Sequence, residues 1–161
     1  MPPQTILMSP PPLPQIGLGL PDPLADNLRF RLEEAERCRE ACAWLAATIM
    51  YGSVLETVLL AVLGRDEPAA LAAARAPRPK SGGKSFPLNT WGLEALLNVA
   101  VDLRKLDPAM AEYAHALRDA RNLIHPAKQE RERSSPDEWL VNVSRQVVES
   151  VMATLDIDRG P

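Results

Sequence analysis

The sequence predicts an all-α protein, an up-and-down bundle of four main helices plus a short one. Hydrophobic residues make up 46% of the 161-residue chain and charged residues 24%, which are ordinary values for a globular domain. Alanine and leucine recur at intervals of three and four residues, the spacing of one helix face. No segment alternates apolar and polar residues as a half-buried strand does. A chain of this length is expected to form one domain.

Residues 1–23 are expected to form a disordered tail, and residues 24–157 the helical domain. Eight prolines lie between Met1 and Pro23, and such a segment favours extended polyproline conformers without burying a face. A PxxP ligand for a partner is the alternative, but no lysine or arginine flanks the proline run. The prolines also interrupt any signal-peptide pattern. We therefore expect a cytoplasmic protein.

Residues 24–63 contain no proline and are expected to form one long helix, bent near Gly52. Its second half, residues 41–63, is apolar on all sides except Glu56 and is long enough to span a membrane. A carboxylate at mid-bilayer costs about 2.5 to 3.5 kcal/mol, however, and the amphipathic helices elsewhere need a surface to pack on. We therefore expect a buried core helix and no membrane association.

The two cysteines, Cys38 and Cys42, are four residues apart in this helix. A disulfide within one helix is poorly accommodated, so we expect two reduced thiols in the core of a cytoplasmic protein. His115 and His125 lie far along the chain and no CxxC pair is present. The sequence therefore predicts no metal site and no cofactor.

The limits of the remaining helices are predicted from their capping residues. A short helix is expected over residues 66–76, and a longer one from Asn89 or Thr90 through Leu106. Asp107 and Pro108 open the next helix, which Pro126 ends near His125. The last helix follows a capping box over residues 135–138. Its inner stripe is expected to contain Trp139, Leu140, Val143, Val147, Val151 and Leu155.

The loop over residues 77–89 holds Arg78, Lys80 and Lys84 with no acidic residue between them. Its GGKS string resembles the end of a phosphate-binding P-loop, but Arg78 stands where the first glycine is required and no helix pattern follows. Two interpretations of the loop stay open: it is a basic arm that touches RNA phosphates, or it is a solvated linker. These three residues and Lys128 are the candidate RNA-binding residues. The net charge of −3 excludes a protein that coats nucleic acid by bulk electrostatics.

One cluster of residues near the end of the fourth expected helix can carry chemistry. At 3.6 residues per turn, Arg118, Arg121, Asn122 and His125 share one stripe. A histidine titrates near neutrality and can move a proton, and a neighbouring arginine can neutralise a phosphoryl group in a transition state. This pairing suits metal-free cleavage of RNA, in which the 2′-hydroxyl is the nucleophile.

At these residues the sequence resembles the HEPN superfamily, small α-helical bundles that usually dimerise and often act as RNA-cleaving toxins. The family pattern is an arginine followed by a polar residue, and then a histidine after four to six intervening positions. Arg118 with Asp119, followed by His125 after six positions, fits this pattern. Arg121 with Asn122 leaves only three positions and is one short. The strings RNLIHP and GSVLE also resemble HEPN-like bacterial proteins of unassigned function.

The resemblance covers residues 24–155 as helix order and implies a homodimeric, metal-independent endoribonuclease of toxin or defence type. In that reading His125 is the general acid or base, Arg118 and Arg121 bind the phosphate, and Asn122 positions them. The alternative is a catalytically silent HEPN-like module that binds a nucleotide or a protein partner such as an antitoxin or a nucleotidyltransferase.

A structural role explains the same residues. Cations in the last turn of a helix complement its dipole, and His125 can satisfy terminal carbonyl groups. The role of Glu56 also has two interpretations. Beside Arg118 or Arg121 it can orient a catalytic arginine, or it can form an ordinary ion pair between two helices.

Overall fold

The computed structural model describes residues 22–132 and 135–154, and every element of regular secondary structure in these residues is a helix. The all-α prediction is therefore confirmed. Residues 1–21 of the expected tail and Leu155 of the expected inner stripe lie outside the described residues. The elements are α1 (Asp22–Glu40), α2 (Trp44–Gly64), α3 (Glu67–Ala72), the 3₁₀ helix η1 (Leu88–Thr90), α4 (Leu93–Asp102), α5 (Pro108–Arg121), the 3₁₀ helix η2 (Asn122–Ile124), α6 (Pro126–Glu132) and α7 (Glu138–Thr154).

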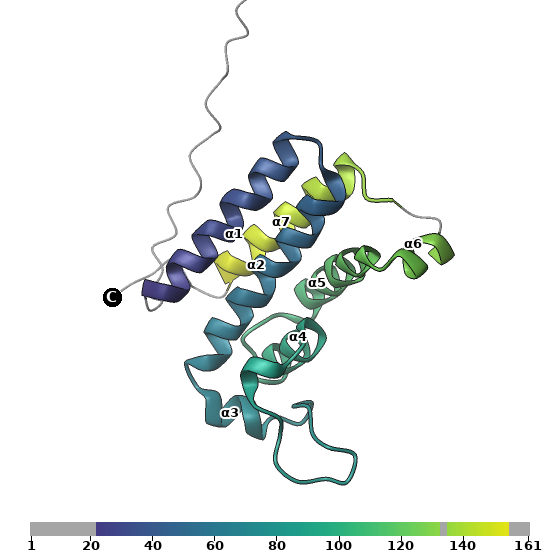
Figure 1. Cartoon of the computed structure of the whole chain (residues 1–161). Coiled ribbons are helices and arrows are strands. Elements are labelled where there is room, and N and C mark those ends of the chain that lie inside the picture. Colours follow the sequence, from purple (N-terminus) through teal and green to yellow (C-terminus); the bar gives the residue numbers. More distant parts are fainter. Residues whose placement is uncertain (1–21, 133–134, 155–161) are drawn as a thin grey trace, which may run out of the picture.

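Helix α2 forms the centre of the bundle. It packs against α1 along its length and also contacts α4, α5 and α7, as Figure 1 shows. Its buried side chains lie all around the helix, which agrees with the expectation of a core helix. It is also the one helix among the described residues that is long and apolar enough to cross a membrane, and 61% of its most apolar window is buried inside the protein.

The expectation of one helix over residues 24–63 is wrong, because the chain turns back at Cys42. The N–H of Ala43 donates to the carbonyl of Cys38 (2.9 Å) and that of Cys42 to the carbonyl of Arg39 (3.0 Å). Cys42 has a φ of 56°. This is a Schellman motif, whose left-handed residue is usually glycine. Cys42 is exposed and Cys38 is half-buried, so the expectation of a core thiol is wrong for Cys42. The described part of the chain therefore holds five helices of ten or more residues instead of four.

Helix starts agree with the sequence better than helix ends do. The carboxylate of Asp66 accepts from the N–H of Ala69 (3.2 Å), and that of Asp107 accepts from the N–H of Ala109 (2.8 Å), so both predicted caps are confirmed. The helix expected from Asn89 or Thr90 begins only at Leu93, after η1. Three ends were wrong. Helix α3 stops at residue 72 instead of 76, and α4 stops at residue 102 instead of 106. Helix α5 stops at residue 121 instead of near 125, and α6, which follows η2, was not predicted.

The inner face of α7 differs in part from the expected stripe. Val147 and Val151 are buried as predicted, but Trp139 is exposed. The buried face also contains Val141, Ser144 and Val148. The N–H of Leu140 donates to Asp137 (2.9 Å), so Asp137 caps the helix in place of Ser135. The apolar residues of α7 fit two overlapping stripes with helical spacing, and the spacing alone does not show which of the two is buried.

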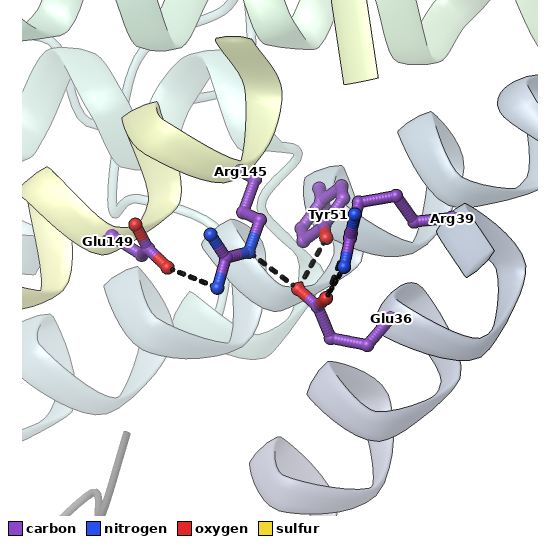
Figure 2. A network of polar contacts seen from close by, with 5 residues as sticks. All are labelled: Glu36, Arg39, Tyr51, Arg145 and Glu149. Atoms are coloured by element: carbon purple, nitrogen blue, oxygen red, sulfur yellow. Dashed lines mark hydrogen bonds and ion pairs between the residues drawn. The ribbon is translucent and has the colours of Figure 1, made fainter. Parts of the chain in front are cut away.

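A charged cluster joins α1, α2 and α7 at the carboxylate of Glu36 (Figure 2). Glu36 Oε1 accepts from the hydroxyl of Tyr51 (2.7 Å) and from Nε of Arg145 (2.8 Å), while Oε2 accepts from Nε of Arg39 (2.9 Å). Arg145 also pairs with Glu149 (3.0 Å). Donors from α1, α2 and the distant α7 therefore share one carboxylate. We call these five residues the Glu36 cluster.

Protonation of Glu36 weakens the cluster. Burial alone would raise the pKa of Glu36, but the hydrogen bonds from Tyr51, Arg145 and Arg39 lower it below its usual 4.5. A carboxyl group whose pKa is lower in the folded state contributes stability that is present above about pH 4.5 and is lost as the pH falls through the folded pKa.

We predict that Glu36→Gln lowers the free energy of unfolding by about 2 kcal/mol at pH 7, because the amide replaces a charged acceptor of several hydrogen bonds. Urea denaturation measured from pH 7 to pH 3 should show the difference from wild type shrinking below pH 4.5. The matched control is Glu34→Gln, which removes an exposed pair with Arg37 on the same helix and should change stability little. Equal effects of the two variants would contradict a supporting role for the Glu36 cluster.

Candidate functional site

The four residues of the predicted stripe do not form one continuous helical stripe. Helix α5 ends at Arg121, and Asn122 begins the 3₁₀ helix η2. His125 follows with φ −80° and ψ 113°, an extended conformation. Its backbone carbonyl accepts from the N–H groups of Lys128 (2.9 Å) and Gln129 (3.0 Å). His125 thus lies at the junction of η2 and α6, where its side chain is exposed to solvent.

Arg121 points from α5 to α2. Its Nη1 lies 2.7 Å from Oε2 of Glu56, in an ion pair that leaves both side chains about 30% exposed. A partly exposed pair of this kind contributes about 1 kcal/mol to stability. Its larger effect is on geometry, because the pair fixes the position of the Arg121 guanidinium against α2. Arg121 is four residues before His125 in the chain.

Gly52 makes room for the Arg121 side chain. A Cβ atom added at Gly52 would lie 2.7 Å from Cδ of Arg121, closer than real Cβ atoms approach, and 3.0 Å from Cγ. Gly52 and Glu56 are one turn apart on α2, so the glycine accommodates the aliphatic part of Arg121 and the glutamate accepts from its guanidinium. The absence of a side chain at residue 52 therefore lets α5 approach α2 at this place.

Arg118 points to a different neighbour. Its Nη1 lies 2.8 Å from Oε2 of Glu94 on α4, and its Nη2 lies 2.6 Å from Oδ1 of Asp119. Asn122 is half-buried and caps α5. The structure thus separates the two arginines, with Arg121 held by α2 and Arg118 held by α4.

Sequence reasoning missed His115, which lies one turn before Arg118 on α5. Burial and the positive charge of Arg118 lower the pKa of His115, while Glu94 and Asp119 act in the opposite direction. The spacing of three residues between His115 and Arg118 was the signal that could have revealed this pair. His115 is half-buried, so it is a second imidazole beside an arginine, but less accessible than His125.

The candidate RNA-binding residues lie in two separate places. Lys80 and Lys84 are exposed on the loop that follows α3, at the bottom of Figure 1, whereas Lys128 lies on α6, which Figure 1 shows at the right. The guanidinium of Arg78 donates to the carbonyls of Leu71, Ala73, Ala74 and Ala76 at 3.1 to 3.5 Å. It therefore faces the carboxyl end of α3. Lys128 Nζ donates to the carbonyl of Asp119 (3.3 Å).

Comparison with known proteins gives no relative. No protein-family model, no curated protein and no solved structure matches the chain. The HEPN resemblance accordingly stays a prediction from the sequence. In the described ranges, no group of three or more histidine, cysteine, aspartate or glutamate side chains is arranged to hold a metal ion.

We predict that Gly52→Ala destabilises the protein by about 1 to 3 kcal/mol, because the added methyl group overlaps Arg121 and a packed contact must shift. The matched control is Gly64→Ala in the same helix, where an added Cβ meets nothing within 4 Å. Alanine is the better helix former by up to about 1 kcal/mol, so Gly64→Ala should not destabilise. Urea denaturation measures both. A Gly52→Ala protein as stable as wild type would show that the close approach of Arg121 does not constrain the fold.

Proposed function

We propose that this chain is a HEPN-like helical domain that cleaves RNA as a dimer, without a metal ion, in a cytoplasmic toxin or defence role. The observation that carries the proposal is the 2.7 Å contact between Arg121 and Glu56. It fixes a guanidinium near the end of α5, four residues before an exposed imidazole. A held cation and an accessible proton carrier are the two groups that such a reaction needs.

The proposed reaction needs no group from outside the chain and the RNA. The 2′-oxygen attacks the adjacent phosphorus and loses its proton to a base, while the bond to the 5′-oxygen breaks and an acid protonates that oxygen. The products are a 2′,3′-cyclic phosphate and a free 5′-hydroxyl group. His125 acts as the acid or the base, and Arg121 stabilises charge on the phosphate.

The ion pairs of the arginines are compatible with phosphate binding. A guanidinium has five N–H donors, and the contact with Glu56 involves Nη1 of Arg121. Glu56 can therefore orient Arg121 while other donors reach the phosphate. Arg118 is a second phosphate ligand in this proposal, and its partner Glu94 is mostly exposed, so a phosphate can replace that weak pair. Asn122 positions the turn that leads to His125.

A homodimer completes the proposed site. Each chain supplies one exposed histidine at the end of η2, whereas general acid and base catalysis benefits from two. A two-fold contact brings a second copy of the same residue. Arg78, Lys80, Lys84 and Lys128 are proposed contacts to flanking RNA phosphates.

The second candidate is a silent HEPN-like module that binds a nucleotide or a protein partner such as an antitoxin or a nucleotidyltransferase. One observation favours it. Arg118 and Arg121 are both already paired with carboxylates from neighbouring helices, which is also how structural arginines hold a bundle together.

We predict that the purified protein cleaves single-stranded RNA in EDTA and leaves a 2′,3′-cyclic phosphate. His125→Ala should lower the rate by a factor of at least about 100, the usual contribution of a general acid or base. The matched control is His115→Ala, which removes the half-buried imidazole of α5 and should retain activity.

The two arginines give the sharper comparison. Arg121→Ala should lower the cleavage rate more than Arg118→Ala, because Glu56 fixes the Arg121 guanidinium and Arg121 is only four residues before the exposed histidine. Cleavage is followed on labelled RNA, and circular dichroism checks the fold of each variant. A folded, dimeric wild type that cuts no RNA, or a His125→Ala variant that cuts as well as wild type, would refute the nuclease and favour the binding module.

A further inference from the structure

The chain between α3 and η1 contains a basic loop that projects from the helices, at the bottom of Figure 1. No acidic residue lies between Glu67 and Glu94, although the whole chain has a net charge of −3. The cations of this stretch are Arg75, Arg78, Lys80 and Lys84. Both arginines are engaged within the protein, Arg75 by Asp102 (2.7 Å) and Arg78 by four backbone carbonyls. The two exposed lysines are therefore the cations most available to a ligand. We call residues 77–87 the basic loop.

The base of the basic loop is fixed on both sides. The N–H of Phe86 donates to the carbonyl of Pro77 (2.9 Å), which joins the two ends of the loop. The hydroxyl of Ser85 donates to the carbonyl of Leu71 at the end of α3 (2.8 Å). The carbonyl of Phe86 accepts from Nε1 of Trp91 (2.9 Å), whose ring is buried in the core. A ligand therefore meets a loop whose base is already ordered, which lowers the entropy cost of binding.

The tip of the basic loop is open to solvent. The N–H of Gly82 donates to the carbonyl of Pro79 (2.9 Å), which makes a turn at the tip. Gly82 and Gly83 have φ values of 80° and 112°, in the region that favours glycine. A Cβ atom added at either glycine would meet nothing within 4 Å. Lys80 and Lys84 lie on the two sides of this turn, so the tip carries two accessible positive charges.

An exposed aromatic ring accompanies these charges. Phe86 is 46% exposed, although its backbone N–H and carbonyl are both bonded within the protein. It lies two residues after Lys84. Cations beside an exposed aromatic ring are the combination that binds single-stranded nucleic acids, because the phosphates contact the cations and a base stacks on the ring. An acidic peptide supplies the negative charges but has no need of the ring.

We propose that the basic loop binds single-stranded RNA, with an unpaired base stacked on Phe86 and the adjoining phosphates at Lys80 and Lys84. The choice of RNA as the ligand rests on the proposed function, whereas the assignment of Phe86 as a binding residue goes beyond it. A base inside a duplex is stacked on its neighbours and offers no free face to a ring. The loop therefore distinguishes unpaired from paired RNA.

The position of the loop shows which part of the RNA it contacts. Figure 1 shows the loop at the bottom of the molecule and α6, which follows His125, at the right. The nucleotide on Phe86 is therefore not the one whose phosphate is cleaved at His125, but one that flanks it. The loop contributes to the binding of a longer strand and contributes no group to the reaction.

Fluorescence anisotropy with a labelled 2′-O-methyl RNA of about 12 nucleotides tests the inference on the full chain. The methyl groups block the 2′-oxygens, so the RNA is bound but not cleaved. Phe86→Ala should weaken binding of the single strand by a factor of at least about five, because one stacked base is lost. Binding of a duplex of the same sequence should not change. Phe86→Trp keeps an aromatic ring and should bind the single strand at least as tightly as wild type. The matched control is Phe30→Ala, which removes a 56% exposed phenylalanine on α1 and should bind like wild type.

Salt dependence separates the lysines from the ring. Lys80→Ala and Lys84→Ala should each lower the slope of the logarithm of affinity against the logarithm of salt concentration by about 0.7, the value for one lost phosphate contact to a single strand. Phe86→Ala should leave this slope unchanged, since stacking releases no counterion. The control is Arg29→Ala on α1, which changes the net charge of the protein by the same amount and should leave the slope unchanged. Circular dichroism checks the fold of each variant.

Three results would overturn the inference. One is a folded wild type that binds no single-stranded RNA at about 50 mM salt. Another is binding that the variants of Phe86, Lys80 and Lys84 leave unchanged. The third is displacement of the RNA by polyglutamate of equal charge as effectively as by unlabelled RNA, which would assign the loop to an acidic protein partner. Since these measurements use RNA that is not cleaved, loop-dependent binding by a protein without nuclease activity would refute the proposed function and leave this inference standing.

Discussion

Helix α2 must be covered on all sides, and the rest of the described structure depends on that constraint. Its apolar side chains lie all around the helix, so one layer of neighbours does not suffice. Its few polar groups select what covers each side. Tyr51 binds Glu36 of α1, the Ser53 hydroxyl accepts from Arg31 of α1, and Glu56 binds Arg121 of α5. The hydrophobic surface of α2 drives the packing, and these contacts fix the neighbours in place.

The same constraint couples the fold to the candidate site. Gly52 and Glu56 lie one turn apart, and together they determine where the end of α5 rests on α2. Arg121 is the last residue of α5, and η2 and then the exposed His125 follow it. The site is thus positioned by a long, buried helix that contributes no reacting group, a common arrangement in which rigid elements support residues at a chain turn.

Local signals were readable from the sequence, whereas contacts between distant segments were not. Asp66 and Asp107 were identified as caps because a cap depends on its next three residues. The turn at Cys42 was missed because a Schellman motif usually announces itself with glycine. Trp139 was assigned to the core because periodicity identifies an apolar face but not what covers it. For the same reason Glu56 could be assigned to Arg118 or to Arg121, and only the fold selects Arg121, 65 residues away.

The central claim is that Glu56 presents Arg121 to an RNA phosphate beside His125. It can be observed directly by NMR, by following the Nε–H signals of the arginines and the imidazole signals of the histidines while a dinucleotide with a 2′-deoxy group at the scissile position is added. The missing 2′-hydroxyl prevents cleavage, so the bound state persists. The account predicts that the signals of Arg121 and His125 shift together, with one dissociation constant. Shifts confined to Arg118 and His115, or no shift in a folded protein, would contradict it.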